Sequence, residues 1–140
     1  MHAVEEYYDG DYYGFIEDYY ATVAQVYEKT HCTIVGHFDL VTKYNENGDL
    51  FDTGHPRYRK AALGALEQLT AAPVLFEINT GAISRGYRKT PYPEPFILRE
   101  LEKRGARLIL SSDCHNKRDL LFRLEECRGL ARGIQYRLFE

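Results

Sequence analysis

The chain has 140 residues, of which 44% are hydrophobic and 28% are charged, and its formal net charge at pH 7 is −3. This composition is typical of a soluble globular protein and excludes a collagen-like or largely disordered chain. The pI near 6.0 disfavours general nucleic-acid binding, because that function needs a positive surface field. We therefore expect small molecules or other proteins as partners.

The sequence contains no targeting or membrane signal that we recognise. No run of about 18 apolar residues is present, and residues 1–11 carry four acids where a signal peptide would carry positive charge. We expect a cytoplasmic protein without membrane contact. Its three cysteines lack CxxC spacing, which predicts reduced thiols rather than disulfides or a structural zinc site.

Helix and strand patterns alternate along the first half of the chain. Apolar and aromatic residues at spacings of three and four predict a helix over residues 11–29, preceded by a disordered terminus that includes His2. A short buried strand is predicted over residues 32–35, and a polar loop over residues 42–54. A proline is then placed to open a helix over residues 56–69.

The second half continues the alternation, with Gly105 as the C-cap of its first helix. In order, we predict a strand at 74–78, a loop at 79–93, a helix at 94–103, a strand at 107–110, a helix at 116–132 and a last strand at 134–139. Strands and helices of this length predict an α/β fold with a parallel sheet, either open or closed into a barrel. No internal repeat or linker appears, so we expect one domain over residues 1–140.

Polar side chains stand directly after each of the three main predicted strands. His37 follows the first strand, Glu77 and Asn79 end the second, and Asp113 and His115 follow the third. The carboxyl ends of parallel strands share one face, which carries the active site in such folds. Imidazole and carboxylate groups are ligands of Zn, Mn or Fe, and an extended Asp-x-His segment would direct both side chains to one side.

Each of these residues also has a simpler interpretation. His37 alone would be read as a hydrogen-bonded core or capping histidine, and Asp113 alone as a helix N-cap. Glu77 is equally compatible with a metal ligand and with an acid that contacts the ligands or the substrate. Because buried carboxylates and imidazoles are costly unless something pairs them, the combination favours a metal or catalytic site.

The loop after the second strand is rich in glycine and positive charge. Arg85 and Arg88 could offer guanidinium forks to a phosphate, although such a loop could also be an ordinary solvated one. Cys114 is predicted to be a packed thiol rather than a nucleophile, because no general base is paired with it by spacing.

Three ordered motifs resemble the PHP family of metallophosphoesterases, and most of all its histidinol-phosphatase branch. They are Ile34-Val35-Gly36-His37-Phe38-Asp39, Phe76-Glu77-Ile78-Asn79-Thr80-Gly81-Ala82 followed by Arg85-Gly86-Tyr87-Arg88, and Leu110-Ser111-Ser112-Asp113-Cys114-His115. The resemblance spans nearly the whole chain. It implies that the chain is the C-terminal part of a distorted (β/α)7 barrel.

The resemblance also implies a reaction and roles for individual residues. Family members hold up to three divalent metals, which bind the phosphate and supply a hydroxide, so the expected reaction converts L-histidinol phosphate to L-histidinol and phosphate in histidine biosynthesis. The implied metal ligands are His37, Asp113 and His115, of which Asp113 and His115 are also expected to be catalytic. The residues implied around the substrate are Glu77, Asn79, Arg85 and Arg88.

One departure from the family pattern shapes the expected activity. The family's N-terminal His-x-His strand has no counterpart before His37, so we expect a partial PHP domain with little phosphatase activity by itself. Its open sheet edges would favour self-association or pairing with a second chain. Two other functions stay open: a PHP phosphoesterase with a different substrate, and a catalytically inactive module for binding or oligomerisation.

Overall fold

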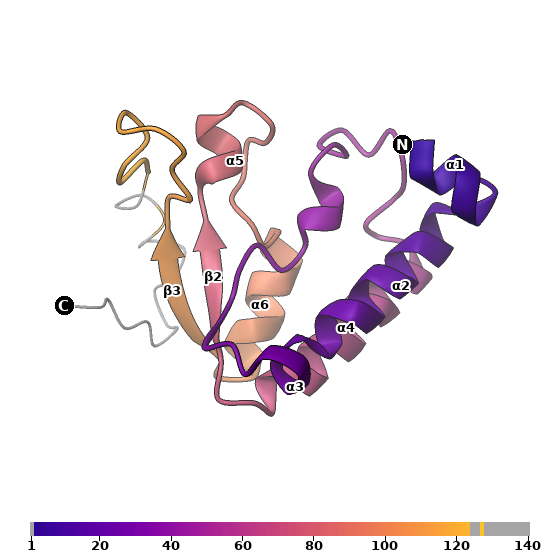
Figure 1. Cartoon of the computed structure of the whole chain (residues 1–140), viewed down its shortest axis with the longest axis horizontal. Helices are drawn as coiled ribbons and strands as arrows, with labels where there is room; N and C mark the ends of the chain where they lie inside the picture. The colour runs from indigo at the N-terminus through magenta and orange to yellow at the C-terminus, as the bar shows by residue number, and fades with distance from the viewer. Residues whose placement is uncertain (1, 124–126, 128–140) are drawn as a thin grey trace.

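The computed structural model describes residues 2–123 and residue 127, and these form an α/β arrangement (Figure 1). Its sheet has three parallel strands in the order β1-β2-β3. The strands are β1 (Ile34–Val35), β2 (Leu75–Asn79) and β3 (Arg107–Ser111). The predicted α/β class and the three main strands are therefore confirmed, each within two residues at its ends.

Helices cover the sheet and extend away from it. They are α1 (His2–Tyr8), α2 (Tyr12–Ala24), α3 (Val26–Thr30), η1 (Leu40–Thr42), α4 (Pro56–Thr70), α5 (Gly81–Ser84) and α6 (Pro95–Lys103). Helices α2 and α4 pack against each other along their lengths, and α6 packs against α4 (Figure 1). Among the described residues, no helix is both long enough and apolar enough to cross a bilayer.

The N-terminal region differs from its prediction in two ways. His2 begins α1, so the predicted disordered terminus is wrong; Val4 is only 5% exposed and anchors this helix to the molecule. The predicted helix over 11–29 is two helices, because the N–H of Gln25 turns back to the Thr22 carbonyl and ends α2. Asp11 caps α2 by accepting from the Tyr13 N–H at 3.0 Å.

Helix α4 follows its sequence signals closely. Pro56 occupies its first turn, and the His55 side chain caps it by accepting from the Arg57 N–H at 3.2 Å. Its buried face uses spacings of three and four, as predicted for an amphipathic helix. That face consists of Tyr58, Ala62, Ala65, Leu66 and Leu69.

The loop predicted over 79–93 contains the short helix α5, which sequence periodicity did not reveal. The Asn79 Oδ1 atom accepts from the Gly81 N–H at 2.9 Å, which turns the chain from β2 directly into α5. Helix α6 ends at Lys103 with Arg104 as its C-cap, one residue before the predicted cap, and Gly105 follows in the left-handed region at a φ of 63°.

The segment after β3 is not the predicted helix. Residues 116–123 form turns, and Leu121 and Arg123 have φ angles of 65° and 53°, which a right-handed helix cannot accommodate. The remainder of the helix predicted over 116–132, apart from residue 127, and the whole strand predicted over 134–139 lie outside the described residues.

Candidate functional site

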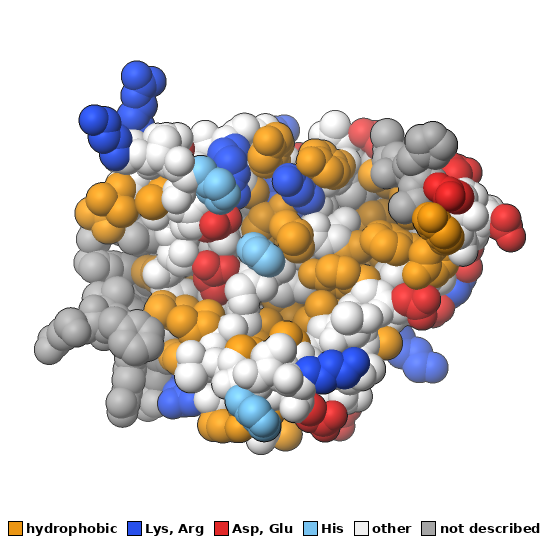
Figure 2. Space-filling view, in the orientation of Figure 1, with side chains coloured by type: hydrophobic (Ala, Val, Ile, Leu, Met, Phe, Trp, Pro, Cys, Tyr) orange, Lys and Arg blue, Asp and Glu red, His pale blue; other side chains and the backbone are white. Residues whose placement is uncertain are grey.

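A cavity of about 360 Å³ lies at the carboxyl ends of the strands. Figure 2 shows histidine, basic and acidic side chains gathered on this face of the molecule. Of the predicted site residues, His37, Arg85, Asp113 and His115 line the cavity. The complete lining is His37, Leu40, Lys43, Ala82, Arg85, Tyr87, Tyr92, Asp113 and His115.

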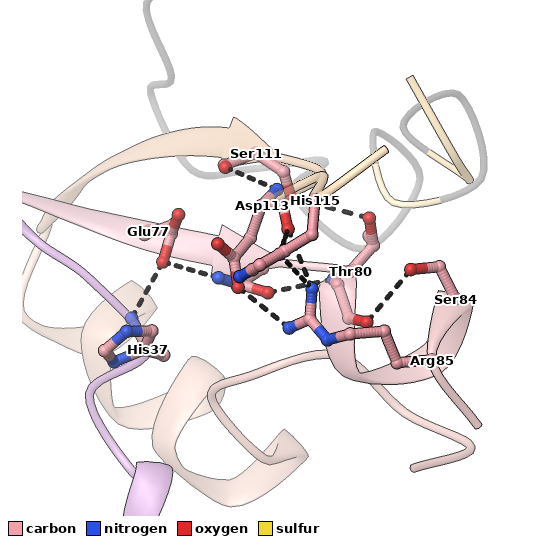
Figure 3. Close-up of polar contacts among 10 residues, drawn as sticks. His37, Glu77, Thr80, Ser84, Arg85, Ser111, Asp113 and His115 are labelled. Carbon is pink, nitrogen blue, oxygen red and sulfur yellow. Dashed lines mark hydrogen bonds and ion pairs between the residues drawn. The ribbon is translucent and has the colours of Figure 1, made fainter. Parts of the chain in front are cut away.

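Arg85 joins α5 to the turn that follows β3 (Figure 3). Its Nη1 donates to the Asp113 carbonyl at 2.8 Å, and its Nη2 donates to Asp113 Oδ2 at 2.9 Å. The same Nη1 lies 2.8 Å from Nδ1 of His115. The guanidinium thus contacts both parts of the Asp-x-His motif and fixes their relative position.

The charge state of Asp113 follows from these contacts. Partial burial raises the pKa of its carboxyl, but hydrogen bonds from Arg85 and Asn79 and the Arg85 charge outweigh that effect. The pKa of Asp113 therefore lies below its usual value, and the side chain is a carboxylate at neutral pH.

The backbone at two site residues is unusual. His37 and Asp113 have φ angles of 27° and 44°, in a region that non-glycine residues rarely adopt. The Asp113–His115 segment is accordingly a turn rather than the extended segment predicted from the sequence, although both side chains reach the same cavity. Such conformations persist only where surrounding contacts hold them, and they concentrate at functional sites.

Glu77 and Asn79 support the site from behind the cavity wall. Glu77 Oε2 accepts from the His37 N–H at 2.8 Å and from Asn79 Nδ2 at 2.9 Å (Figure 3). Asn79 is 1% exposed, and its amide oxygen accepts from the Gly81 N–H. These contacts connect the turn after β1 to the start of α5 and so position His37.

Arg88 is separated from the other predicted residues. It is 8% exposed, donates to Thr42 Oγ1, and holds its guanidinium 4.5 Å from the centre of the Tyr92 ring. It lines a different cavity of about 570 Å³, together with Glu46 and Glu94 among others. The structure therefore does not bring Arg85 and Arg88 to one anion-binding position.

A buried acid lies beneath this region. Asp39 is fully buried, and burial raises the pKa of its carboxyl to about 7 despite the nearby Arg88 charge. Its Oδ2 accepts from the Glu94 N–H at 2.8 Å, whereas its Oδ1 has no partner among the described residues.

The tautomer of His115 decides what its ring can bind. Nδ1 lies 2.8 Å from the Asp113 carbonyl, which can only accept, and also 2.8 Å from Arg85, which can only donate. When Nδ1 carries the proton and donates to the carbonyl, Nε2 keeps a free lone pair. That tautomer is the one suited to a metal ligand through Nε2.

The imidazole and carboxylate groups at the cavity are suitable ligands for a divalent metal, but too few of those described lie close together. Within residues 2–123 and residue 127, no three side chains of His, Cys, Asp or Glu are placed to hold one ion together. Metal binding by His37, Asp113 and His115 consequently stays a prediction.

Sequence reasoning missed several cavity residues and misplaced one thiol. Lys43, Tyr87 and Tyr92 line the cavity. Lys43 lies six residues beyond His37, and only the turn of η1 shows that it returns to the site. Cys114 is exposed rather than packed, because the turn at Asp113 directs it to solvent.

Two curated proteins match this chain in sequence. A protein of Deinococcus radiodurans named probable histidinol-phosphatase is 31% identical over 130 residues, which is 88% of this chain and 44% of that protein. A protein of Schizosaccharomyces pombe with the same name is 28% identical over 100 residues, which is 70% of this chain and 32% of that protein. No family model matches the chain.

The chain spans less than half the length of both curated relatives. Over that part, the two matches and the motifs at the strand ends point to the same kind of relative, the histidinol-phosphatases. Over that part, the chain is similar in sequence to proteins named probable histidinol-phosphatase.

Proposed function

We propose that this chain forms the phosphate-binding part and a share of the metal-binding part of a phosphatase that converts L-histidinol phosphate to L-histidinol and phosphate. The observation that carries the proposal is the shared cavity. His37, Arg85, Asp113 and His115 meet there at the carboxyl ends of parallel strands, in a chain whose relatives are named probable histidinol-phosphatase.

In the proposed reaction, this chain's residues bind and orient. Arg85 holds the Asp113–His115 turn, and Glu77 holds the backbone of His37, so both sides of the cavity are fixed before substrate enters. A divalent ion, Zn, Mn or Fe, bound by His37, Asp113 and His115 with further ligands, would neutralise phosphoryl charge and lower the pKa of a bound water.

The proposal extends to the surroundings of the site. The three-stranded sheet would be a segment of a distorted (β/α)7 PHP barrel, with residues 1–140 as one partial domain of a cytoplasmic enzyme. The remaining ligands and strands would come from outside the described residues or from a second chain. We therefore expect little turnover from this chain alone.

The experiment measures metal content and phosphate release together. The purified chain is incubated with Zn, Mn or Fe and assayed with L-histidinol phosphate and with other phosphomonoesters, beside the His37→Ala variant. We expect metal binding that weakens in the variant, and slow release that prefers L-histidinol phosphate.

The alternatives give different results. Equal rates on unrelated phosphomonoesters would indicate a phosphoesterase with another substrate. Metal uptake without any release would indicate a binding or oligomerisation module. Turnover that is unaffected by His37→Ala would contradict the proposed site.

A further inference from the structure

Lys43 contributes a second positive side chain to the candidate cavity. It lies immediately after η1 and lines the cavity together with His37, Arg85, Asp113 and His115. Arg85 reaches the cavity from α5, so the two cations come from different elements of the fold.

Two tyrosines hold the Lys43 ammonium group. Its Nζ lies 5.1 Å from the ring centre of Tyr44 and 4.9 Å from that of Tyr87. The rings meet edge to face, with centres 6.1 Å apart. Both tyrosines are large and exposed, at 69% and 41%, so core packing does not account for their positions. Aromatic faces attract a cation and restrain it without neutralising its charge.

The two cations of the cavity differ in how their charge is balanced. Arg85 forms an ion pair with Asp113 at 2.9 Å. Lys43 has no ion pair with a carboxylate within the part of the chain that the structure describes. A restrained ammonium without a counter-charge favours the entry of an anion into the cavity.

We propose that Lys43, held between Tyr44 and Tyr87, binds the phosphoryl group of the substrate. The identity of the substrate rests on the proposed function, but the contact with a phosphate does not. Arg85 then positions the Asp113–His115 turn, while Lys43 supplies the point charge that meets the phosphoryl oxygens.

The test is a titration of inorganic phosphate into the purified chain at low ionic strength. Calorimetry measures the affinity, and the amide NMR shifts of Tyr44 and Tyr87 report where the phosphate binds. Lys43→Met should weaken phosphate binding roughly tenfold, because one charge-assisted hydrogen bond is lost. Lys43→Arg should retain most of the affinity. Lys89→Met is the matched control, since Lys89 is exposed and lies outside the cavity lining.

The tyrosines are tested by a second pair of variants. Tyr87→Phe keeps the aromatic face and should keep the affinity, whereas Tyr87→Leu should reduce it. Circular dichroism and thermal melting of every variant separate lost binding from lost folding.

Parallel assays of L-histidinol phosphate hydrolysis distinguish this inference from the proposed function. Phosphate binding that needs Lys43, in a chain without turnover, would support the inference and count against the function. Turnover with unchanged KM and unchanged phosphate affinity in Lys43→Met would overturn the inference alone. Equal losses in the Lys43 and Lys89 variants, or no phosphate binding by the original chain, would also overturn it.

Discussion

At the scale of single residues, Arg85 connects α5 with the turn after β3 through its contacts with Asp113 and His115. A lysine at this position has one ammonium group and cannot make the same fork of hydrogen bonds. Arg85→Lys should therefore loosen the turn while the fold persists.

Amide hydrogen exchange measures this loosening directly. The N–H groups of Asp113 and Thr80, which donate to Ser111, should exchange roughly tenfold faster in Arg85→Lys, because charged hydrogen bonds contribute about 1.5–3 kcal/mol. Arg99→Lys, at an exposed position of α6, should change neither rate. Unchanged exchange in Arg85→Lys would show that the turn is held by other contacts.

The buried phenols of Tyr20 and Tyr58 should make the stability of the chain depend on pH. Burial raises the pKa of both phenols, and Tyr20 donates to the Tyr58 hydroxyl oxygen at 3.1 Å. The folded chain keeps these protons at pH values where the unfolded chain loses them. The resulting stability is complete below about pH 10, the usual phenol pKa, and is lost as the pH rises further.

Absorbance at 295 nm and circular dichroism, followed together from pH 9 to 13, check this prediction. Part of the tyrosinate signal should appear only when helical structure is lost. Tyr58→Phe should shrink that late step, whereas Tyr44→Phe, at a 69% exposed position, should leave the unfolding pH unchanged. Complete ionisation before any loss of helix would contradict it.

At the scale of elements, two glycines in helices should respond oppositely to alanine. A Cβ at Gly64 in α4 would meet nothing within 4 Å, whereas one at Gly81 in α5 would lie 2.9 Å from the Ser112 carbonyl and from Arg85. Gly64→Ala should stabilise the chain by about 0.5–1 kcal/mol through helix propensity. Gly81→Ala should destabilise it by about 1–3 kcal/mol through overpacking. Urea unfolding measures the free energy of unfolding of both variants. A Gly81→Ala variant that is more stable than the original chain would contradict the predicted overpacking.

The elements also show which sequence signals are sufficient to predict a helix or strand and its ends. Pro56 and a regular buried face predicted α4, and apolar runs predicted β2 and β3 to within two residues. The break at Gln25 has no local signal. The turn at Leu121 also has none, because it is held from outside by Thr80, whose hydroxyl donates to the Phe122 carbonyl at 2.7 Å.

In the candidate site, too, some features could be predicted from the sequence and others could not. Its residues at the strand ends could be predicted, since parallel topology alone brings His37 and Asp113 to one edge. The separation of Arg85 from Arg88 could not, because Gly86, at a φ of 74°, turns the chain between them. Lys43 was missed because its position depends on the path of the chain through η1.

At the scale of the whole molecule, the sheet presents an edge at β1. Within the described residues this strand pairs only with β2, and Ile34 is 38% exposed. Unpaired edges with apolar side chains favour association between chains.

Sedimentation velocity at several concentrations tests this consequence. We expect concentration-dependent association that Ile34→Lys reduces, because a charge on an edge strand opposes pairing. Leu120→Lys changes an equally apolar side chain that is 61% exposed but lies in the turns after β3, and should have no effect. A monomer at every concentration would rule out the predicted self-association.

The contacts of α5 with the segment after β3 also determine when the cavity can form during synthesis. Gly81 and Arg85 are made before the turn at Asp113, and Thr80 reaches as far as Phe122. On the ribosome, α5 therefore emerges before the groups that it binds. The cavity takes its shape only when the chain beyond β3 has left the exit tunnel, so a nascent chain stalled earlier holds half of a site.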